Sequence, residues 1–341
     1  MPADPAHIAT TRQLLTHLGL TPADLTTNAD HGPAMPTVAE YLPRVAAAAT
    51  PGTRRTYAIH WNRMATAFGD RRLDTIHATD IEALMRHAIA TARPRRNSRH
   101  GRHAGEHVIA AARALYNRAI ADGHISRTAS PAHRIAKPRR LPNTRRALTP
   151  NELEEINLVA HTSGNDVILD CLLLRLHTET ACRRGGALAL RLTDLDTTNA
   201  LVHLNEKGGT LRWQPITPLL ATRLHEHATA RGAVLPTDKL LRYRNRRPIS
   251  ARRYDHLWTR IGQRLPWVAV HGISTHWIRH TTLTWVERHY GYGTARAYAG
   301  HTDSRGPATT TYIKADLTAV ATALAAMTGQ PHPLADADLR G

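Results

Sequence analysis

Six residues in the second half of the chain carry side chains suited to chemistry on a phosphodiester. They are Arg183, Lys207, His276, Arg279, His301 and Tyr312. Cleavage without a metal ion needs a nucleophile, cations on the nonbridging oxygens, a proton donor for the leaving 5′ oxygen and a base. Arginine suits the cationic role because its planar fork binds phosphate oxygens in pairs and stays charged. The set therefore predicts phosphodiester cleavage with Tyr312 as the nucleophile and with no cofactor or metal.

The six residues lie in four motifs. They are Thr180-Ala-Cys-Arg183-Arg-Gly-Gly, Lys207 on an expected hairpin turn, His276-Trp-Ile-Arg279-His280-Thr, and Ala299-Gly-His301 followed by Thr309-Thr-Thr-Tyr312. One such motif would be a weak signal, but all of them in this order are a strong one. The order resembles that of the tyrosine recombinase (phage integrase) family. The resemblance covers residues 36 to about 325, including an N-terminal helical region similar to the family's core-binding domain.

The resemblance implies a role for each residue. Arg183 and Arg279 would hold the scissile phosphate, and Tyr312 would attack it to give a 3′-phosphotyrosyl link and a free 5′ hydroxyl. His276 would accept the tyrosine proton, Lys207 would protonate the leaving oxygen, and His301 would hydrogen-bond the phosphate. The implied activity is site-specific DNA recombination by a tetramer on double-stranded recombination sites, and a directionality factor is a possible further partner.

Three positions depart from the family pattern. Gly186 stands where the family usually has a glutamate that supports the site, so the local packing or charge must differ. Ala181 replaces the usual glycine before the first arginine, with little expected effect. The segment from His301 to Tyr312 is about two residues longer than the commonest spacing, and Gly306 and Pro307 suggest a loop that absorbs the difference.

The N-terminal part is expected to be helical. After a Thr-, Ala- and Pro-rich extension (1–35, with one short helix near 7–18), Thr37-Val-Ala-Glu40 matches a capping box. A second helix is predicted after Pro51, a third opened by Thr79-Asp-Ile-Glu82, and a fourth over about 105–122, where an apolar stripe has helical spacing. Residues 36–135 are therefore predicted to form a helical core DNA-binding domain.

The second domain is expected at 149–330, after a basic, proline-broken linker at 136–148. It opens with a capping box from Thr149 to Glu152, and its first helices reach about residue 188. Short strands are predicted near 193–196, 200–204 and 211–217, and helices from 218 to about 328, before a loose tail (331–341). The fold class is mainly α: a SAM-like helical domain, then a mostly helical catalytic domain with a small antiparallel sheet.

The charge favours a polyanionic partner. Lys plus Arg number 45 against 27 Asp plus Glu, for a formal net charge of +18. A high-GC coding bias explains why arginine outnumbers lysine but not the shortage of acids. Basic residues placed on phosphates release condensed counterions. Expected DNA contacts are the basic loop and the linker, namely Arg95, Arg96, Arg99, Arg102, Arg139 and Arg140.

Simpler interpretations were weighed for other residues. His276 and His280 could be a zinc pair, but the glutamate of a His-Glu-x-x-His site is missing. Cys171 and Cys182 resemble small core residues rather than a disulfide framework. No stretch approaches the about 20 apolar residues of a membrane helix, and no signal peptide is evident. The expected location is the reducing cytoplasm, at the nucleoid.

Two other functions compete with recombination. A type IB topoisomerase uses related chemistry but works alone and relaxes supercoils. A catalytically silent DNA-binding protein could keep the same scaffold. His276 in the second-arginine motif favours the recombinase, whereas Gly186 leaves the silent DNA-binding protein as an alternative. Tyr290, Tyr292 and Tyr298 are rival tyrosines, interpreted as packing or loop residues. The apolar helix near 316–327 could close its own domain or dock on a neighbouring protomer.

Overall fold

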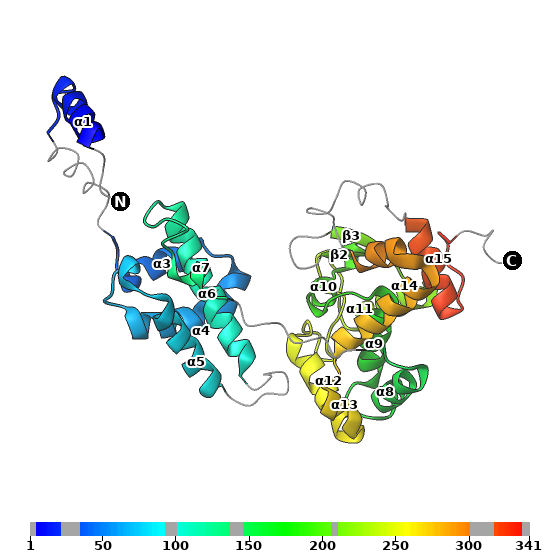
Figure 1. Ribbon diagram of the computed structural model, residues 1–341. Coiled ribbons are helices and arrows are strands. Elements are labelled where there is room, and N and C mark those ends of the chain that lie inside the picture. Colours follow the sequence, from blue (N-terminus) through cyan, green and yellow to red (C-terminus); the bar gives the residue numbers. More distant parts are fainter. Residues whose placement is uncertain are drawn as a thin grey trace. The chain divides into compact units, whose positions relative to one another are not determined.

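The computed structural model describes most of the chain as helices joined by short segments (Figure 1). The described residues are 5–21, 35–92, 101–136, 146–205, 211–300 and 317–335. Within them the chain divides into two compact units, Met1–Leu141 and Pro142–Gly341, and each is described by itself. The mainly helical fold class with one small antiparallel sheet is confirmed.

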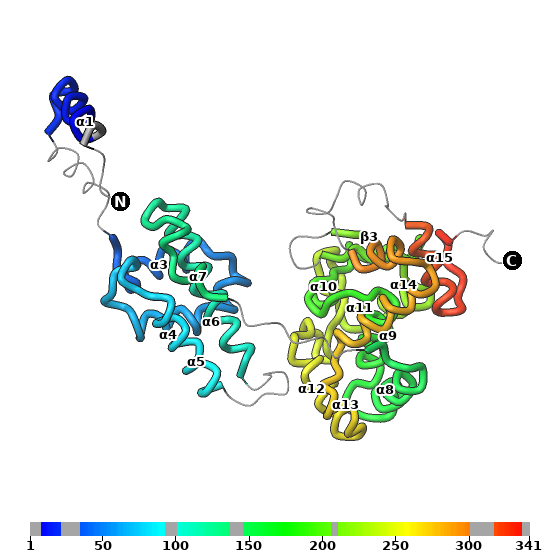
Figure 2. Tube along the Cα trace, viewed as in Figure 1, coloured from blue at the N-terminus to red at the C-terminus, as the bar shows by residue number. Residues whose placement is uncertain are grey.

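The described residues of the first unit form helices joined by short segments. Its helices are α1 (Pro5–His17), α3 (Val38–Ala48), α4 (Pro51–Phe68), α5 (Ala78–Ala90), α6 (Arg102–Ala121) and α7 (Pro131–Arg134). Helix α6 packs against α4 and α5, and their apolar faces enclose fully buried residues such as Tyr41, Met64 and Leu115. Figure 2 traces α3 to α7 as one bundle.

The caps explain where two of these helices begin. At α3 the predicted capping box is confirmed: Thr37 N donates to Glu40 Oε2 at 2.8 Å, and Glu40 N donates to the Thr37 hydroxyl at 3.3 Å. At α5 the predicted box of Thr79 with Glu82 is wrong. The helix begins two residues earlier, because His77 N donates to Asp80 Oδ2 at 2.8 Å and so makes His77 the residue that caps the helix.

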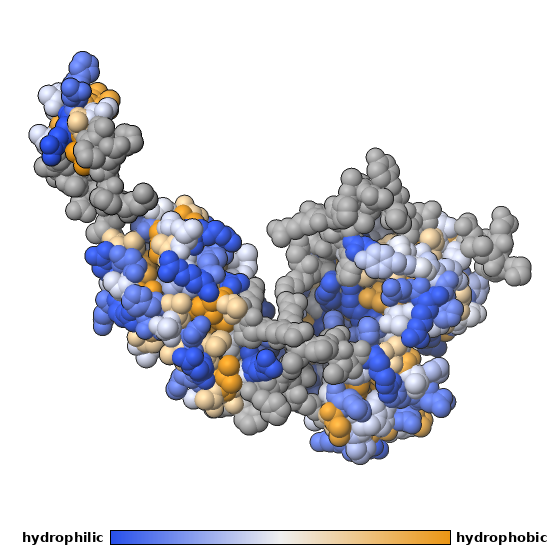
Figure 3. All heavy atoms as spheres, viewed as in Figure 1, coloured by the Kyte–Doolittle hydropathy of each residue, from blue (hydrophilic) through white to orange (hydrophobic). Residues whose placement is uncertain are grey.

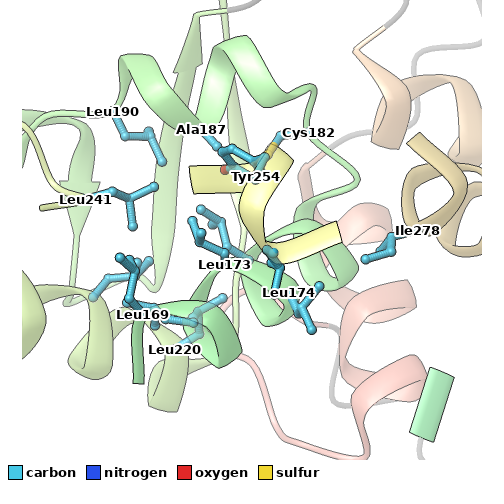
Figure 4. Packing of buried hydrophobic residues seen from close by; sticks show 14 of the residues in the cluster. Leu169, Leu173, Leu174, Cys182, Ala187, Leu190, Leu220, Leu241, Tyr254 and Ile278 are labelled. Atoms are coloured by element: carbon cyan, nitrogen blue, oxygen red, sulfur yellow. The ribbon is translucent and has the colours of Figure 1, made fainter. Parts of the chain in front are cut away.

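The second unit surrounds a large apolar core with helices. They are α8 (Pro150–Thr162), α9 (Val167–Thr180), α10 (Arg184–Ala189), α11 (Pro218–Ala230), α12 (Ala251–Arg264), α13 (Pro266–His271), α14 (Thr275–Ala299) and α15 (Leu317–Thr328). The predicted capping box between Thr149 and Glu152 is confirmed at α8. Helix α9 contributes Leu169, Leu173 and Leu174 to the core (Figure 4).

A three-stranded antiparallel sheet lies between these helices in the chain. Its strands are β1 (Leu195–Asp196), β2 (Leu201–Asn205) and β3 (Leu211–Pro215), in the order β1-β2-β3. Of the first predicted strand (193–196), Leu195 and Asp196 pair with β2, whereas Thr193 and Asp194 belong to a 3₁₀ turn (Leu192–Asp194). In the long β2–β3 pairing, Val202 lies opposite Gln214 and both are buried, whereas His203 lies opposite Trp213 on the other face.

The C-terminal segment packs on the second unit. Helix α15 lies against α14 and β3, and it buries Val320, Ala323 and Leu324 in a small cluster with Tyr298 (Figure 1). The expected loose tail is wrong for residues 331–335, because His332 is 4% exposed and its Nε2 lies 3.1 Å from Ala200 O. The apolar face of α15 therefore closes its own unit.

The described surface is predominantly polar on the face drawn in Figure 3, where apolar residues form small separate groups. Within the described ranges, no helix is both long enough and apolar enough to cross a membrane.

Candidate active site

The first candidate arginine follows a sharp turn at the end of α9. Ala181 caps the helix in the left-handed region (φ 49°), and Arg183 then serves as the N-cap residue of α10 in extended backbone. A left-handed conformation costs an L-residue about 1–2 kcal/mol, so the surroundings must hold this turn. Arg183, the residue that follows this turn, borders a pocket.

Side chains cap four consecutive carbonyl groups at this turn, and three of them come from distant elements. The hydroxyl of Tyr298 donates to Glu179 O, Arg212 Nη2 donates to Thr180 O, Arg279 Nη1 donates to Ala181 O, and His177 Nδ1 lies 3.1 Å from Cys182 O. The last carbonyls of a helix have no partner inside the helix, so capping groups are needed when they are buried. The turn before Arg183 is thereby fixed from four directions.

Arg279 is one of these four capping side chains and is itself nearly buried, with 4% of its surface exposed. Its Nη1 donates to Ala181 O and its Nη2 donates to Ala299 O at 2.8 Å. One guanidinium thus joins the turn before Arg183 to the end of α14. Because a guanidinium carries five N–H donors, these two bonds are compatible with phosphate binding by the same group.

The start of α14 places His276 beside Arg183. Both residues line a pocket of about 510 Å³, together with Cys182, Gly186, Tyr254 and Trp258. The helix start is fixed by Trp258 Nε1, which donates to the Thr275 hydroxyl at 2.9 Å. His276 is exposed at the second position of the helix. Two candidate residues from motifs 93 positions apart therefore share one pocket.

Gly186 lies in α10 and is buried at the wall of this pocket. The acidic residue that lines the pocket is Asp255 of α12, and its Oδ1 accepts from Arg184 Nη1 at 3.2 Å. The acid in the pocket is therefore supplied by α12, a source that the sequence did not suggest.

A buried ion cluster holds α12 against α9. Asp170 is fully buried; its Oδ1 accepts from Arg253 Nε at 2.8 Å, and its Oδ2 accepts from Arg260. Arg253 Nη2 also donates to Asp166 O at 3.0 Å. Buried charges persist only when they are paired and hydrogen-bonded, as they are here. The cluster fixes the helix that carries Tyr254 and Asp255 relative to the helix that precedes Arg183.

The end of α14 is equally constrained. Gly300 has φ 65°, and a Cβ at this position would lie 2.5 Å from two atoms of the Arg212 side chain. Arg212 is the residue that caps Thr180 O, so glycine here lets the chain turn directly over the capping group. The residue that follows Gly300 is the candidate His301, which begins a segment outside the described ranges.

Several candidates lie outside the described residues. These are Lys207, His301 and Tyr312 of the proposed chemistry, and Arg95, Arg96, Arg99, Arg139 and Arg140 of the expected DNA contacts. Arg102 is described: it is the first residue of α6 and is partly buried. Among the rival tyrosines, Tyr298 is fully buried, as its interpretation as a packing residue predicts, and Tyr292 is 61% exposed.

The described residues also bear on the metal and thiol interpretations. Within the described ranges, no group of three or more His, Cys, Asp or Glu side chains is arranged to hold a metal ion. Both cysteines are free thiols; Cys182 is buried and Cys171 is partly buried. Sequence reasoning missed His177 and Tyr254. The signal for His177 was a polar residue in the largely apolar helix α9, whereas Tyr254 lies in the polar helix α12 and carried no such signal.

Comparisons with known proteins agree with this geometry. The model of the phage integrase family matches residues 146–317, which is half of the chain. The tyrosine recombinase XerC of Roseiflexus sp. (strain RS-1) is 29% identical over 159 residues, which are 44% of this chain and 50% of that protein. The chain thus spans about half the length of the curated relative it matches.

Two solved structures share the fold. A lambda integrase tetramer bound to a Holliday junction has 16% identity and a TM-score of 0.58, covering 90% of each chain. The Tn1549 transposon integrase with circular intermediate DNA has 14% identity and a TM-score of 0.60, covering 82% of this chain and 95% of its own. At these identities the likeness shows the fold alone.

The second unit therefore has the integrase catalytic fold, with a pocket formed at the end of α9 and the start of α14. The chain belongs to the phage integrase family, as the match over 146–317 shows.

Proposed function

We propose that this protein is a tyrosine-type site-specific DNA recombinase. The observation that carries the proposal is the pocket that Arg183 and His276 both line. The turn before Arg183 is held by Arg279, which donates to the main-chain carbonyl of Ala181. Two guanidinium groups and an imidazole on rigid elements suit a phosphate that gains charge during transfer.

In the proposed reaction, the Tyr312 oxygen attacks the scissile phosphorus and the bond to the 5′ oxygen breaks. His276 takes the proton of the tyrosine hydroxyl, and Lys207 gives a proton to the leaving 5′ oxygen. The product is a 3′-phosphotyrosyl bond and a free 5′ hydroxyl. Attack of a 5′ hydroxyl on this bond reverses the steps, so rejoining needs no ATP.

During both steps the phosphate's nonbridging oxygens carry the charge to be stabilised. Arg183 and Arg279 bind these oxygens, and His301 adds a hydrogen bond. Arg279 performs this task from a buried position in which its orientation is already fixed by Ala181 O and Ala299 O. Such fixed donors lower the barrier because little reorganisation remains to be done when the reaction starts.

The partner in this proposal is double-stranded DNA carrying recombination sites, bound by a tetramer, so the protein works where the chromosome lies, at the nucleoid. The helical unit of residues 36–135 is the proposed core-binding domain, and residues 136–148 are the basic linker between the domains. Their arginines (Arg95, Arg96, Arg99, Arg102, Arg139 and Arg140) contact phosphates. The support is the net charge of +18 and the lambda integrase tetramer that shares the fold.

The test uses nicked duplexes tiled across the DNA that flanks the gene, each with a nick that lets the cleaved strand diffuse away and so traps the adduct. We expect a covalent adduct in which the protein is joined to the 3′ phosphate at the break, and this adduct should be lost in Tyr312→Phe. The matched control is Tyr292→Phe, which alters an exposed tyrosine and keeps the adduct.

Three other outcomes would count against the proposal. An adduct that survives Tyr312→Phe would move the nucleophile to another residue. No adduct on any duplex, combined with specific retention of one of them, would indicate a silent DNA-binding protein. Relaxation of supercoiled plasmid at protein concentrations where only monomer is present would indicate a topoisomerase.

A further inference from the structure

A buried pair, His177 and Tyr254, lies directly behind the residue that precedes Arg183. His177 Nε2 lies 2.9 Å from the Tyr254 hydroxyl oxygen, and His177 Nδ1 lies 3.1 Å from Cys182 O. The side chains of all three residues are at most 2% exposed. Figure 4 shows Tyr254 of α12 beside Cys182, where α9 has ended. A continuous chain of polar contacts thus runs from α12 through α9 to the turn.

The directions of these hydrogen bonds follow from the acceptor at one end. A carbonyl oxygen can only accept, so the bond to Cys182 O forms in the tautomer of a neutral His177 that carries its ring proton on Nδ1. The Cys182 Sγ atom lies 3.4 Å from the same nitrogen. In this tautomer Nε2 is an acceptor, and the phenol of Tyr254 is its donor. Burial raises the pKa of Tyr254 well above its usual value, which keeps this hydroxyl protonated and able to donate.

The carbonyl that His177 holds has a direct bearing on Arg183. Cys182 C=O and Arg183 N–H belong to the same planar peptide unit, which also contains the Cα of Arg183. Fixing the carbonyl oxygen therefore fixes the plane from which the Arg183 side chain departs. The preceding peptide is held by Arg279 at Ala181 O, so two consecutive peptide planes are oriented by side chains.

The position of Tyr254 is fixed independently of His177, because its helix α12 is hydrogen-bonded to α9. Its neighbour Arg253 is hydrogen-bonded to Asp170 and to Asp166 O, both on or next to α9. The hydroxyl of Tyr254 therefore reaches His177 from a helix whose position is independently set. Hydrogen-bonded chains of this kind act jointly, since each bond polarises the next.

We propose that His177 and Tyr254 are positioning residues, which set the direction of the Arg183 guanidinium through the Cys182–Arg183 peptide. The inference rests on the proposed function, in which Arg183 binds the scissile phosphate. Neither side chain acts on DNA itself. Gly186 brings no side chain to the wall of the pocket in this chain. The pair supports Arg183 instead, through the peptide that joins it to Cys182.

The expected effects are on cleavage and not on DNA affinity. Misplacing a catalytic group by about 1 Å can cost about 100-fold in rate, whereas distant phosphate contacts keep the affinity. With the full chain and saturating nicked duplex, Tyr254→Phe should cleave roughly tenfold more slowly, and His177→Leu roughly 100-fold more slowly. His177→Asn, which can still donate to Cys182 O, should fall between wild type and His177→Leu.

A double variant shows whether Tyr254 and His177 act through one another or affect packing independently. If the Tyr254 hydroxyl acts through His177, adding Tyr254→Phe to His177→Leu should change the cleavage rate less than twofold further. Independent effects would multiply instead. The matched control is Tyr116→Phe in the first unit, because the Tyr116 hydroxyl is also buried and also donates to a main-chain carbonyl, Leu73 O at 2.9 Å. It should leave the cleavage rate unchanged.

A second readout does not depend on cleavage. The Arg183 Nε–H resonance is observed by NMR in the full chain while inorganic phosphate is added. In wild type we expect an ordered side chain and a phosphate-dependent shift; in Tyr254→Phe we expect greater mobility and a smaller shift. If wild type forms no adduct, the proposed function fails, and this NMR comparison alone decides the positioning role.

Three results would overturn the inference. One is a Tyr254→Phe cleavage rate within twofold of wild type. The second is a rate loss that is fully matched by weaker DNA binding or by unfolding at the assay temperature. The third is an Arg183 resonance whose mobility and phosphate response are the same in Tyr254→Phe as in wild type.

Discussion

Arg279 donates a hydrogen bond to the main-chain carbonyl of Ala181, two residues before Arg183. The second arginine of the site therefore orients the first through the backbone, before any DNA is bound. Arg279 also holds Ala299 O, the carbonyl just before Gly300. One guanidinium thus ties together three of the four motifs found in the sequence.

The two carbonyl bonds should make Arg279 important for stability as well as for cleavage. In Arg279→Lys the single ammonium cannot span both oxygens, which leaves a buried carbonyl without its donor. We expect the free energy of unfolding to fall by about 2 kcal/mol and cleavage to slow by roughly 100-fold or more. Urea unfolding and the nicked-duplex assay measure the two effects. Arg264→Lys, at an exposed residue of α12, is the control, and wild-type stability of Arg279→Lys would refute the bridging role.

Ala181 bears a backbone strain that a glycine would not. Its φ of 49° costs an L-residue about 1–2 kcal/mol, while glycine pays about 0.5–1 kcal/mol in chain entropy. Loss of the buried methyl group offsets part of this gain, so Ala181→Gly should raise the free energy of unfolding by less than about 1 kcal/mol.

The control for this prediction is a substitution that should lower the free energy of unfolding. Ala326 is exposed within α15, where glycine destabilises a helix, so Ala326→Gly should lower the stability by up to about 1 kcal/mol. Both variants are compared by urea unfolding. A loss of stability in Ala181→Gly would show that the turn is not strained as described.

The buried carboxylate of Asp170 should be among the most sensitive positions of the second unit. It is fully buried between Arg253 and Arg260, and the neutral amide of Asp170→Asn would leave two buried cations without their counter-charge. Breaking a buried pair in this way costs about 3–5 kcal/mol. Asp74→Asn removes an exposed partner of Arg72 and should cost less than about 1 kcal/mol. Thermal unfolding of both variants tests the contrast, and equal small losses would contradict it.

Local signals in the sequence were sufficient to place most helices. The capping boxes of Thr37 and Thr149 were predicted correctly, because both partners lie three residues apart and the bonds form within one turn. The box assigned to Thr79 was wrong for the same local reason, since His77 and Asp80 offered a competing pair two residues earlier. Competing caps of similar strength cannot be ranked without the surrounding packing.

The supports of the site could not be predicted in this way. The side chains that cap Glu179 O, Thr180 O and Ala181 O come from residues 32 to 119 positions away along the chain. Residue type and spacing identified Arg183, His276 and Arg279 as candidates. Their supports, such as Tyr254 and Arg212, carry no motif, because a buried tyrosine or arginine has many structural uses and only the tertiary fold selects one.

His60 gives the first unit a defined pH dependence. Burial, then the nearby His107 and Arg63, lower the pKa of His60 to about 4. Its Nδ1 is buried with no hydrogen-bond partner among the described residues, and its ring lies 5.6 Å from that of His107 on α6. The unfolded chain, with a pKa near 6.5, therefore binds a proton that the folded unit rejects.

The sign of the effect follows from that difference. The stability linked to His60 is fully present above about pH 6.5 and is lost progressively as the pH falls towards 4, with a total of about 1–3 kcal/mol. Hydrogen exchange of α4 amides at pH 5 and pH 7.5, corrected for intrinsic rates, measures the loss. His60→Leu should reduce the difference between the two pH values, whereas His87→Gln, at an exposed residue of α5, should keep it. An unchanged difference in His60→Leu would assign the pH dependence to other groups of the unit.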